Sequence, residues 1–265
     1  MMEAIPVENS NSSDRIFITG VHKGIGHALA KHYLERGIHV VGISRKHPED
    51  LRTFKNFEFF PVDLGDRSSV QRFIADNLPS LTREPLTTVY FNAGISGDIP
   101  VRAEDCSLED LERVCMVNTY SIKLCLDGFI KLAALPEKCV FSASIAGQRF
   151  RAGMLPYSVS KAALTAMAGV YAQENPATFF IIIGLCTMDT DLSRRMLAQP
   201  NISQFPELSA LAMRCEQAGY MTPPEIRAEQ LAFIVSNTDR FNIKSGIFSE
   251  IRTLLRDQNE VSATN

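Results

Sequence analysis

Short β-rich runs alternate with amphipathic helical runs along almost the whole of this 265-residue chain. The first pair sets the pattern, since residues 15–19 have the composition of a buried strand and residues 24–36 carry apolar side chains at helical spacing. Further strands are expected at residues 39–44, 57–62, 88–91, 138–142, 179–184 and 246–251, and further helices at 66–78, 107–135, 156–174 and 224–236. The alternation predicts an α/β fold in which a doubly wound, mostly parallel seven-stranded sheet carries helices on both faces.

The same pattern predicts a single domain, because no stretch rich in Pro, Gly or Ser divides it. Residues 1–14 are rich in Ser, Asn and Glu and are expected to form a flexible leader. The domain is expected to span residues 15–256 and a C-terminal tail residues 257–265. Residues 189–224 contain four prolines and no clear periodicity, so we expect an irregular substrate lid there.

Composition narrows the class of protein. The net charge of −3 gives no indication of a nucleic-acid or anionic-membrane partner. The N-terminus lacks the basic start and apolar core of a signal peptide, and no apolar run reaches transmembrane length. Six scattered cysteines and five histidines show no zinc-like spacing. We therefore expect a cytoplasmic protein that binds no metal, nucleic acid or membrane.

A glycine-rich segment, TGVHKGIG at residues 19–26, lies directly between the first expected strand and the first expected helix. In a dinucleotide-binding loop, glycines make the tight turn, let the backbone approach a pyrophosphate and let the helix pack on the strand. The helix N-terminus then offers free N–H groups to the phosphates. The segment predicts a Rossmann-type cofactor site with these residues as ligands: Gly20, Lys23, Gly24, Ile25 and Gly26.

The end of the second expected strand indicates which dinucleotide is bound. An acidic residue there would favour the ribose 2′-hydroxyl of NAD, whereas Ser44, Arg45 and Lys46 offer no acid. With Lys23, three cations would surround one ribose and favour a 2′-phosphate. We therefore expect NADP(H) in preference to NAD(H). The alternative for the two strand-end cations is an ordinary solvated loop.

Tyr157 and Lys161 are four residues apart on an expected helix, so their side chains share one face. A free tyrosine titrates near pH ~10, and a nearby ammonium lowers that pKa by favouring the phenolate. The pair can therefore exchange a proton with a carbonyl oxygen. Ser144 follows the strand at 138–142, at the edge of the sheet where ligands bind, and its hydroxyl can donate to the same oxygen.

These features occur in one order that resembles the short-chain dehydrogenase/reductase family along residues 15–192. TGVHKGIG matches the family's TGxxxGxG, YSVSK matches its YxxSK, and Ser144 precedes Tyr157 by the usual spacing. The resemblance implies further sites: the adenine contact at Asp63 and Leu64, the NAG motif at Asn92, Ala93 and Gly94, and a catalytic asparagine at Asn118.

The resemblance also implies roles for the central residues. Tyr157 would transfer a proton to or from the substrate oxygen, and Lys161 would lower the tyrosine pKa and bind the nicotinamide ribose. Ser144 would orient the substrate oxygen, and Asn118 would hold a water of the proton relay. The reaction implied is hydride transfer from NADP(H) that reduces a small-molecule carbonyl to an alcohol.

Two departures from the family pattern stand out. Leu185 and Cys186 replace the usual Pro-Gly, although Met188 and Thr190 keep the residue types that contact the nicotinamide amide. The C-terminus lacks the Asp-Gly-Gly around which the family's tetramer packs, so we expect a homo-oligomer for which a dimer is better supported than a tetramer. The MDTDL stretch at residues 188–192, with the shortened C-terminus, resembles the sepiapterin-reductase-like and small carbonyl-reductase branches.

The substrate pocket is expected to be mostly apolar. Its expected lining residues are Ser96, Ile145, Phe150, Met154, Leu192 and Met196. Arg149 and Arg151 could receive an anionic substrate, although a solvated loop also explains them. Nothing in these residues selects one class of carbonyl compound.

Two functions from different classes remain open. The first is an active NADPH-dependent carbonyl reductase, and the second is a non-catalytic NADP(H)-binding regulator or scaffold of the same fold. The presence of all four catalytic residue types favours the first. A serine hydrolase using Ser144 is disfavoured because the chain has no GxSxG elbow there.

Overall fold

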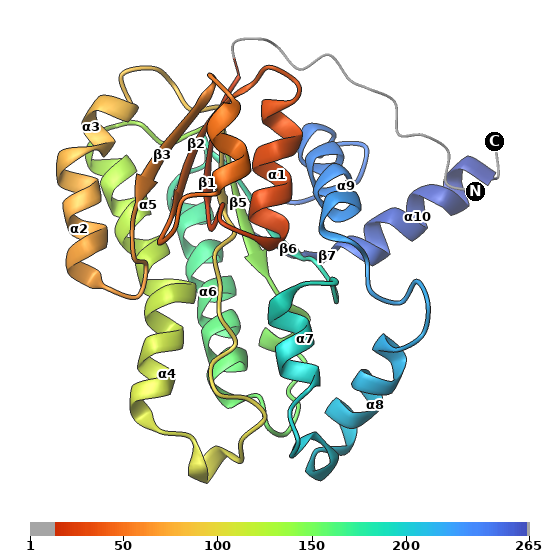
Figure 1. The fold of residues 1–265 in the computed structure, drawn as a ribbon. Coiled ribbons are helices and arrows are strands. Elements are labelled where there is room, and N and C mark those ends of the chain that lie inside the picture. The colour runs from red at the N-terminus through yellow and green to blue at the C-terminus, as the bar shows by residue number, and fades with distance from the viewer. Residues whose placement is uncertain (1–13, 264–265) are drawn as a thin grey trace.

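A computed structural model describes residues 14–263, so the expected leader lies outside the described residues except for Asp14. The strands are β1 Arg15–Thr19, β2 His39–Ser44, β3 Phe57–Pro61, β4 Thr88–Phe91, β5 Lys138–Ala143, β6 Phe179–Gly184 and β7 Phe248–Glu250. All six neighbouring pairs are parallel, in the order β3-β2-β1-β4-β5-β6-β7. The predicted fold class is confirmed (Figure 1).

Helices cover both faces of the sheet (Figure 1). They are α1 Gly24–Leu34, α2 Arg67–Asp76, α3 Leu78–Leu81, α4 Leu108–Cys115, α5 Ser121–Lys131, α6 Leu155–Glu174, α7 Asp191–Leu197, α8 Pro206–Cys215, α9 Pro224–Ser236 and α10 Ile251–Ala263. Buried side chains of α1 and α9 form one apolar layer, and those of α2, α5 and α6 form the other. Successive side chains of β1 point to opposite faces of the sheet and so contribute to both layers. Ile16 and Ile18 lie in the first layer and Phe17 lies in the second.

The long helix expected at 107–135 is interrupted. Ser107 caps α4 by accepting a hydrogen bond from the Asp110 N–H, and α4 then passes into a π-helical turn at Met116–Tyr120 before α5 begins. Single π turns inside helices are frequent at functional sites. The interruption therefore marks the one irregular turn of this helix, and it contains Asn118.

Two expectations about the second half of the chain are wrong. The segment at 189–224 is not irregular, because it contains α7 and α8. Prolines there begin helices rather than prevent them: Pro206 opens α8 and Pro224 opens α9, at first-turn positions where no N–H is needed. The expected boundary at residue 256 also falls inside α10, which contains no Gly or Pro to end it earlier.

Candidate active site

The glycine-rich loop closes tightly between β1 and α1. Gly20 has φ +81° and Gly24 has φ +64°, which only glycine adopts without strain. A Cβ on Gly26 would lie 2.4 Å from the Gly20 carbonyl oxygen and 2.5 Å from Asn92 Nδ2. Helix α1 has no side-chain cap and no acidic residue in its first turn, so its N-terminal N–H groups and dipole are left for an anion.

The end of β4 is fastened to the end of β1. The Thr19 hydroxyl accepts hydrogen bonds from the N–H groups of Asn92 at 2.9 Å and Ala93 at 3.0 Å. The Asn92 amide oxygen in turn accepts from the Ser142 hydroxyl at 3.1 Å. These bonds place the Asn-Ala-Gly segment beside the glycine loop, as the sequence predicts.

Asn118 is fully buried, and its amide holds the loop that follows β4. Its Oδ1 accepts from the Ile95 N–H, and its Nδ2 donates to the Ile95 carbonyl and to the Ser160 hydroxyl, each at 2.9 Å. A Cβ placed on Gly94 would lie 3.4 Å from Asn118 Oδ1 and 3.5 Å from Lys161 Nζ. Three of the predicted site residues therefore meet at one point, within van der Waals reach of one another.

Tyr157 and Lys161 lie together near the start of α6, as their spacing predicts. The Lys161 ammonium lies 5.7 Å from the centre of the Tyr157 ring and donates to the Ser142 carbonyl at 2.7 Å. Burial lowers the pKa of Lys161 to about 8.

The direction of the tyrosine shift differs from the expectation. Burial raises the pKa of Tyr157, and the contribution that lowers it is a side-chain hydrogen bond with Ser144 rather than Lys161. The difference arises because the ammonium faces the ring and a main-chain carbonyl. Ser144 itself caps a short 3₁₀ turn by accepting from the Ala146 N–H at 3.1 Å.

The end of β2 carries free cations. Arg45 and Lys46 are exposed and have no ion-pair partner among the described residues, while the Ser44 hydroxyl is buried and donates to the Lys46 carbonyl. The nearby acidic side chains already form ion pairs with other residues, since Asp50 lies 2.9 Å from His27 and Glu49 lies 3.0 Å from Arg52. Among the described residues, the two cations at the end of β2 are therefore left without a neutralising carboxylate.

Two residues predicted to contact the adenine follow β3. Asp63 is exposed, and its carboxylate accepts from the Gly65 N–H at 2.8 Å. Leu64 is buried in the apolar layer formed by α2, α5 and α6. The turn therefore presents the acid outward and anchors itself by the leucine.

The segment after β6 approaches the glycine loop. The Thr190 methyl would lie 3.7 Å from a Cβ on Gly24, and Thr190 caps α7 by accepting from the Ser193 N–H. Met188 pairs with Thr222. Lys23 does not stay free to join Arg45 and Lys46, because its ammonium lies 2.7 Å from the Asp191 carboxylate.

Cys186 stands where the family pattern has the glycine of Pro-Gly, and its backbone keeps the conformation of a glycine. Its φ of +59° lies in the left-handed region that favours glycine. Burial and then Glu250 raise the pKa of its thiol, so the thiol stays protonated at neutral pH. The residue is therefore a neutral, half-buried side chain rather than a nucleophile.

The predicted substrate residues separate into two groups. Met154 and Met196 join an apolar cluster that packs against Tyr157 and also contains Ile99, Ala146, Ile202, Phe205 and Leu208. Phe150 is 73% exposed and Leu192 39%, and neither belongs to this cluster. Ser96 and Ile145 are half-buried, and the Ser96 hydroxyl donates to the Gly97 carbonyl.

Sequence reasoning missed the larger part of this apolar cluster. Ile99 follows β4, whereas Phe205 and Leu208 come from the segment at 189–224. Their only sequence signal is that they are apolar residues in irregular or helical segments. Contact between such distant segments needs the three-dimensional fold.

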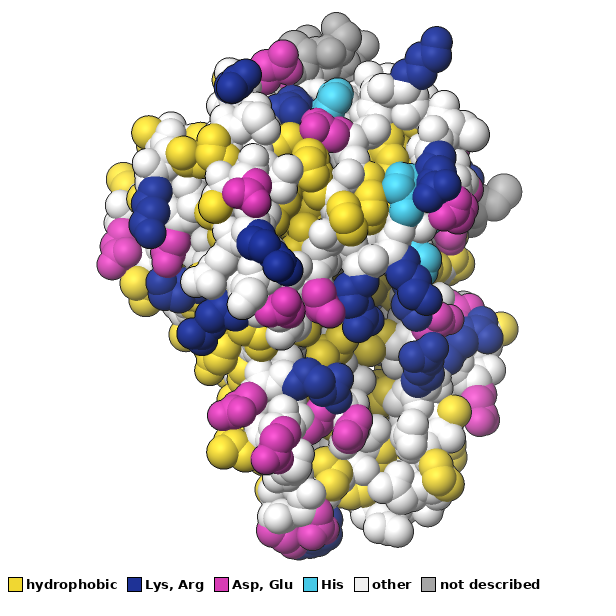
Figure 2. Space-filling model, turned by 60° about the vertical axis from the view of Figure 1, so that its left-hand side comes forward, with side chains coloured by type: hydrophobic (Ala, Val, Ile, Leu, Met, Phe, Trp, Pro, Cys, Tyr) yellow, Lys and Arg dark blue, Asp and Glu magenta, His cyan; other side chains and the backbone are white. Residues whose placement is uncertain are grey.

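Two kinds of feature that would bear on function are absent from residues 14–263. No group of three or more His, Cys, Asp or Glu side chains is arranged to hold a metal ion. None of the helices described is long and apolar enough to cross a membrane. On the face in Figure 2, basic and acidic side chains are interspersed.

A dinucleotide-binding loop, a Tyr–Lys pair and a serine at one sheet edge define the class of nicotinamide-dependent oxidoreductases. The family model for short chain dehydrogenases matches residues 14–200, and the chain therefore belongs to the short-chain dehydrogenase/reductase family.

Curated relatives match only in part. The chain is 32% identical to the protein FixR of Bradyrhizobium diazoefficiens over 60% of each chain. It is 28% identical to the NADPH-dependent 3-dehydrocapnine reductase of Ornithobacterium rhinotracheale, over 59% of this chain and 58% of that one. Both matches therefore span less than two thirds of the relative.

Solved structures show the same fold. The KRED1-Pglu enzyme superposes with a TM-score of 0.76 at 17% identity, over 89% of this chain and 100% of that one. A short chain dehydrogenase from Burkholderia cenocepacia in complex with NADP superposes with a TM-score of 0.70 at 22% identity, over 90% and 96%.

Proposed function

We propose that this protein is an NADP(H)-dependent oxidoreductase that reduces a ketone or aldehyde to an alcohol, with Tyr157 as the acid/base. The observation that carries the proposal is the grouping of Tyr157, its hydrogen-bond partner Ser144 and the buried Lys161. The two relatives named as NADPH-dependent reductases, including the pterin aldehyde reductase of Arabidopsis thaliana at 27% identity, support the choice of cofactor.

The residues present fit a dinucleotide. The contacts around Gly20 and Gly26 leave no room for a side chain, so backbone N–H groups alone form the phosphate cradle. At the other end, the exposed Arg45 and Lys46 would bind a 2′-phosphate, and Lys161 would bind the nicotinamide ribose. When bound, the cofactor supplies the hydride.

The chain's own residues then have separate tasks. The Ser144 hydroxyl would hydrogen-bond the carbonyl oxygen and hold it beside the Tyr157 hydroxyl. As hydride reaches the carbonyl carbon, Tyr157 donates its proton to the oxygen, which becomes the alcohol. The raised pKa of Tyr157 suits this direction, because the hydroxyl stays protonated at neutral pH. Asn118 would fix the loop at Ile95 that borders the site.

The cluster over Tyr157 favours an apolar substrate. Met154 and Phe205 are almost fully buried against it, and Phe205 comes from the segment at 189–224. We propose that this segment is the lid, that it moves to admit the substrate, and that it then excludes water from the reacting groups.

The alternative is a non-catalytic NADP(H)-binding regulator. The strained Cys186, at a position where the family's glycine would relax the backbone, favours it. NADPH oxidation with a panel of apolar aldehydes and ketones separates the two. Turnover supports the reductase, whereas tight NADPH binding without turnover of any compound would favour the regulator.

A further inference from the structure

Ser160 connects the buried Asn118 amide to the helix that carries Tyr157 and Lys161. It belongs to the YSVSK segment of α6, and none of its surface is exposed. Its hydroxyl donates to the Tyr157 carbonyl at 2.8 Å and accepts from Asn118 Nδ2 at 2.9 Å. One hydroxyl therefore joins the π-helical turn at Met116–Tyr120 to the main chain of the residue proposed as the acid/base.

The direction of each hydrogen bond in this chain is fixed. A serine hydroxyl has one hydrogen, which Ser160 gives to the Tyr157 carbonyl, so its oxygen is left to accept from Asn118. The second hydrogen of the Asn118 amide goes to the Ile95 carbonyl, and its oxygen accepts from the Ile95 N–H. Without the Ser160 hydroxyl, one amide N–H would be buried with no partner, which is costly. The amide is then expected to leave its position and to release Ile95.

A second hydrogen bond fastens Ser160 to the same turn. The Thr119 hydroxyl donates to the Ser160 carbonyl at 2.9 Å, and both residues are buried. The next residue, Lys161, donates to the Ser142 carbonyl at the end of β5. Two consecutive residues of α6 are therefore fastened to the π-helical turn and to the sheet.

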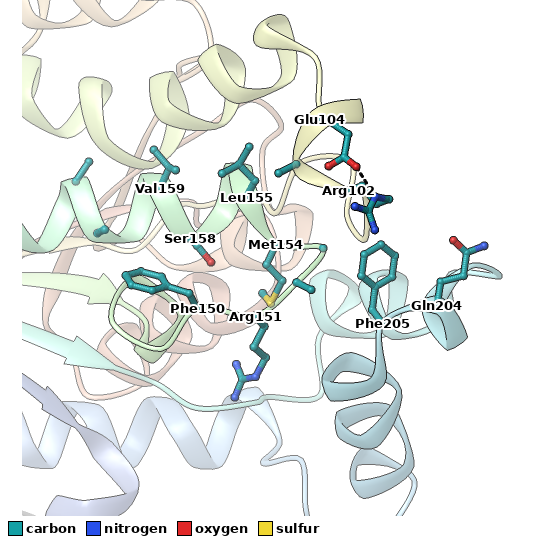
Figure 3. Close-up of a pocket in the computed structure, with 15 residues that line it drawn as sticks. Arg102, Glu104, Phe150, Arg151, Met154, Leu155, Ser158, Val159, Gln204 and Phe205 are labelled. Atoms are coloured by element: carbon teal, nitrogen blue, oxygen red, sulfur yellow. Dashed lines mark hydrogen bonds and ion pairs between the residues drawn. The ribbon is translucent and has the colours of Figure 1, made fainter.

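The other hydroxyls nearby on α6 do not make this connection. Ser158 lies two residues earlier, about 200° around the helix, on the wall of a cavity that Val159 also lines (Figure 3). Its Oγ is buried and makes no hydrogen bond to any described residue. Thr165 donates back to the Lys161 carbonyl at 2.9 Å. Among the described residues, Ser160 is therefore the α6 hydroxyl that reaches Asn118.

We propose that Ser160 is a positioning residue, which acts through Asn118 to hold the loop at Ile95 at a fixed distance from Tyr157. The inference rests on the proposed reductase function, because it gives Ser160 a task in turnover. A misplacement of about 1 Å at a reacting centre can cost ~100-fold in rate. Ser160→Ala should therefore lower kcat by about tenfold. The KM of the carbonyl substrate and the affinity for NADPH should stay within about twofold, since no group proposed to bind either is removed.

The kinetic test is a double-mutant cycle in the full chain with Asn118→Ala. Because Ser160 acts through Asn118, Ser160→Ala should cause no further loss of kcat once Asn118 is replaced. Ser160→Cys keeps a weak donor and acceptor, so its kcat should lie between those of the wild type and Ser160→Ala. Thr165→Val removes a hydroxyl that bonds back within the same helix, and it should keep the wild-type kcat.

Amide hydrogen exchange followed by NMR supplies a readout that needs no turnover. Ser160→Ala should speed exchange of the Ile95 N–H by about tenfold, because its acceptor on Asn118 is no longer held in place. Thr165→Val should leave that exchange unchanged. If Ser160→Ala does not fold, Ser160→Cys takes its place in both measurements, with smaller effects in the same direction.

Two results would overturn the positioning role. The first is Ile95 exchange that is equally slow in the wild type and in Ser160→Ala. The second is a kcat loss for Ser160→Ala that is as large in the Asn118→Ala background as in the wild type, since the two residues would then act independently. Failure of the proposed function has a different signature, namely a wild-type protein that turns over no carbonyl compound while Ser160→Ala still accelerates Ile95 exchange.

Discussion

The Lys161 ammonium donates a hydrogen bond to the main-chain carbonyl of Ser142 at 2.7 Å. The bond joins helix α6 to the end of β5, and it holds a cation in a place where only 4% of the residue is exposed. The ammonium is thereby fixed under the Tyr157 ring. Its burial has a consequence for stability that can be measured without a substrate.

Stability should depend on pH through Lys161. Burial lowers its pKa from 10.5 to about 8, so the folded protein releases this proton before the unfolded chain does. Between these two values the unfolded chain binds more protons, and the free energy of unfolding rises with pH. Relative to Lys161→Met, the wild-type protein should gain up to about 3 kcal/mol across that window.

Urea unfolding of both proteins at several pH values checks this prediction. Other titrating groups are common to both, so the difference between the two curves isolates the lysine. Parallel curves from neutral pH to above pH ~10, the pKa of a free lysine, would mean that its ammonium is not desolvated in the fold.

Cofactor preference should depend on Arg45. Arg45→Asp replaces an exposed cation by an anion at the expected 2′-phosphate position, so NADPH affinity should fall by at least about tenfold. NADH affinity should change little. Fluorescence titration with both cofactors measures this, with Arg36→Asp, two residues after the end of α1, as a charge-reversal control. An equal loss for both cofactors would remove the argument for NADP.

The left-handed residue after β6 should respond to glycine. Cys186→Gly and Cys186→Ala both remove the thiol, but only the glycine variant relieves a φ of +59°. The glycine variant should therefore be more stable than the alanine variant by about 1 kcal/mol. Thermal unfolding of the pair measures the difference, and an alanine variant that is equally stable would show that this backbone is unstrained.

The sheet and the glycine-rich loop between β1 and α1 could be predicted from local sequence patterns. Strand β6 falls at its expected bounds, and β2 and β4 do as well, because short apolar runs between turn residues report burial directly. Tyr157 and Lys161 share a face because helical geometry alone determines it. The glycines of the loop were identifiable because a positive φ and a close backbone contact exclude other residues.

Other features depend on contacts between distant segments. The π-helical turn at Asn118 has no signal in the helical periodicity of residues 107–135. The raised pKa of Tyr157 reflects burial, and the pairing of Lys23 with Asp191 reflects where α7 begins. The helices in residues 189–224 could not be predicted from the sequence, because its prolines indicate breaks in a helix. Proline is also common in the first turn of a helix, as Pro206 is in α8.

The role of Tyr157 is tested most directly by removing one oxygen atom. Tyr157→Phe should reduce NADPH-dependent turnover of the best carbonyl substrate by on the order of 100-fold or more, since the proton donor is lost. NADPH affinity should stay within about twofold, because no cofactor-binding charge is removed. Tyr171→Phe, on the same helix with its hydroxyl bonded to Asp127, is the matched control and should keep wild-type turnover. Wild-type turnover by Tyr157→Phe would contradict the account.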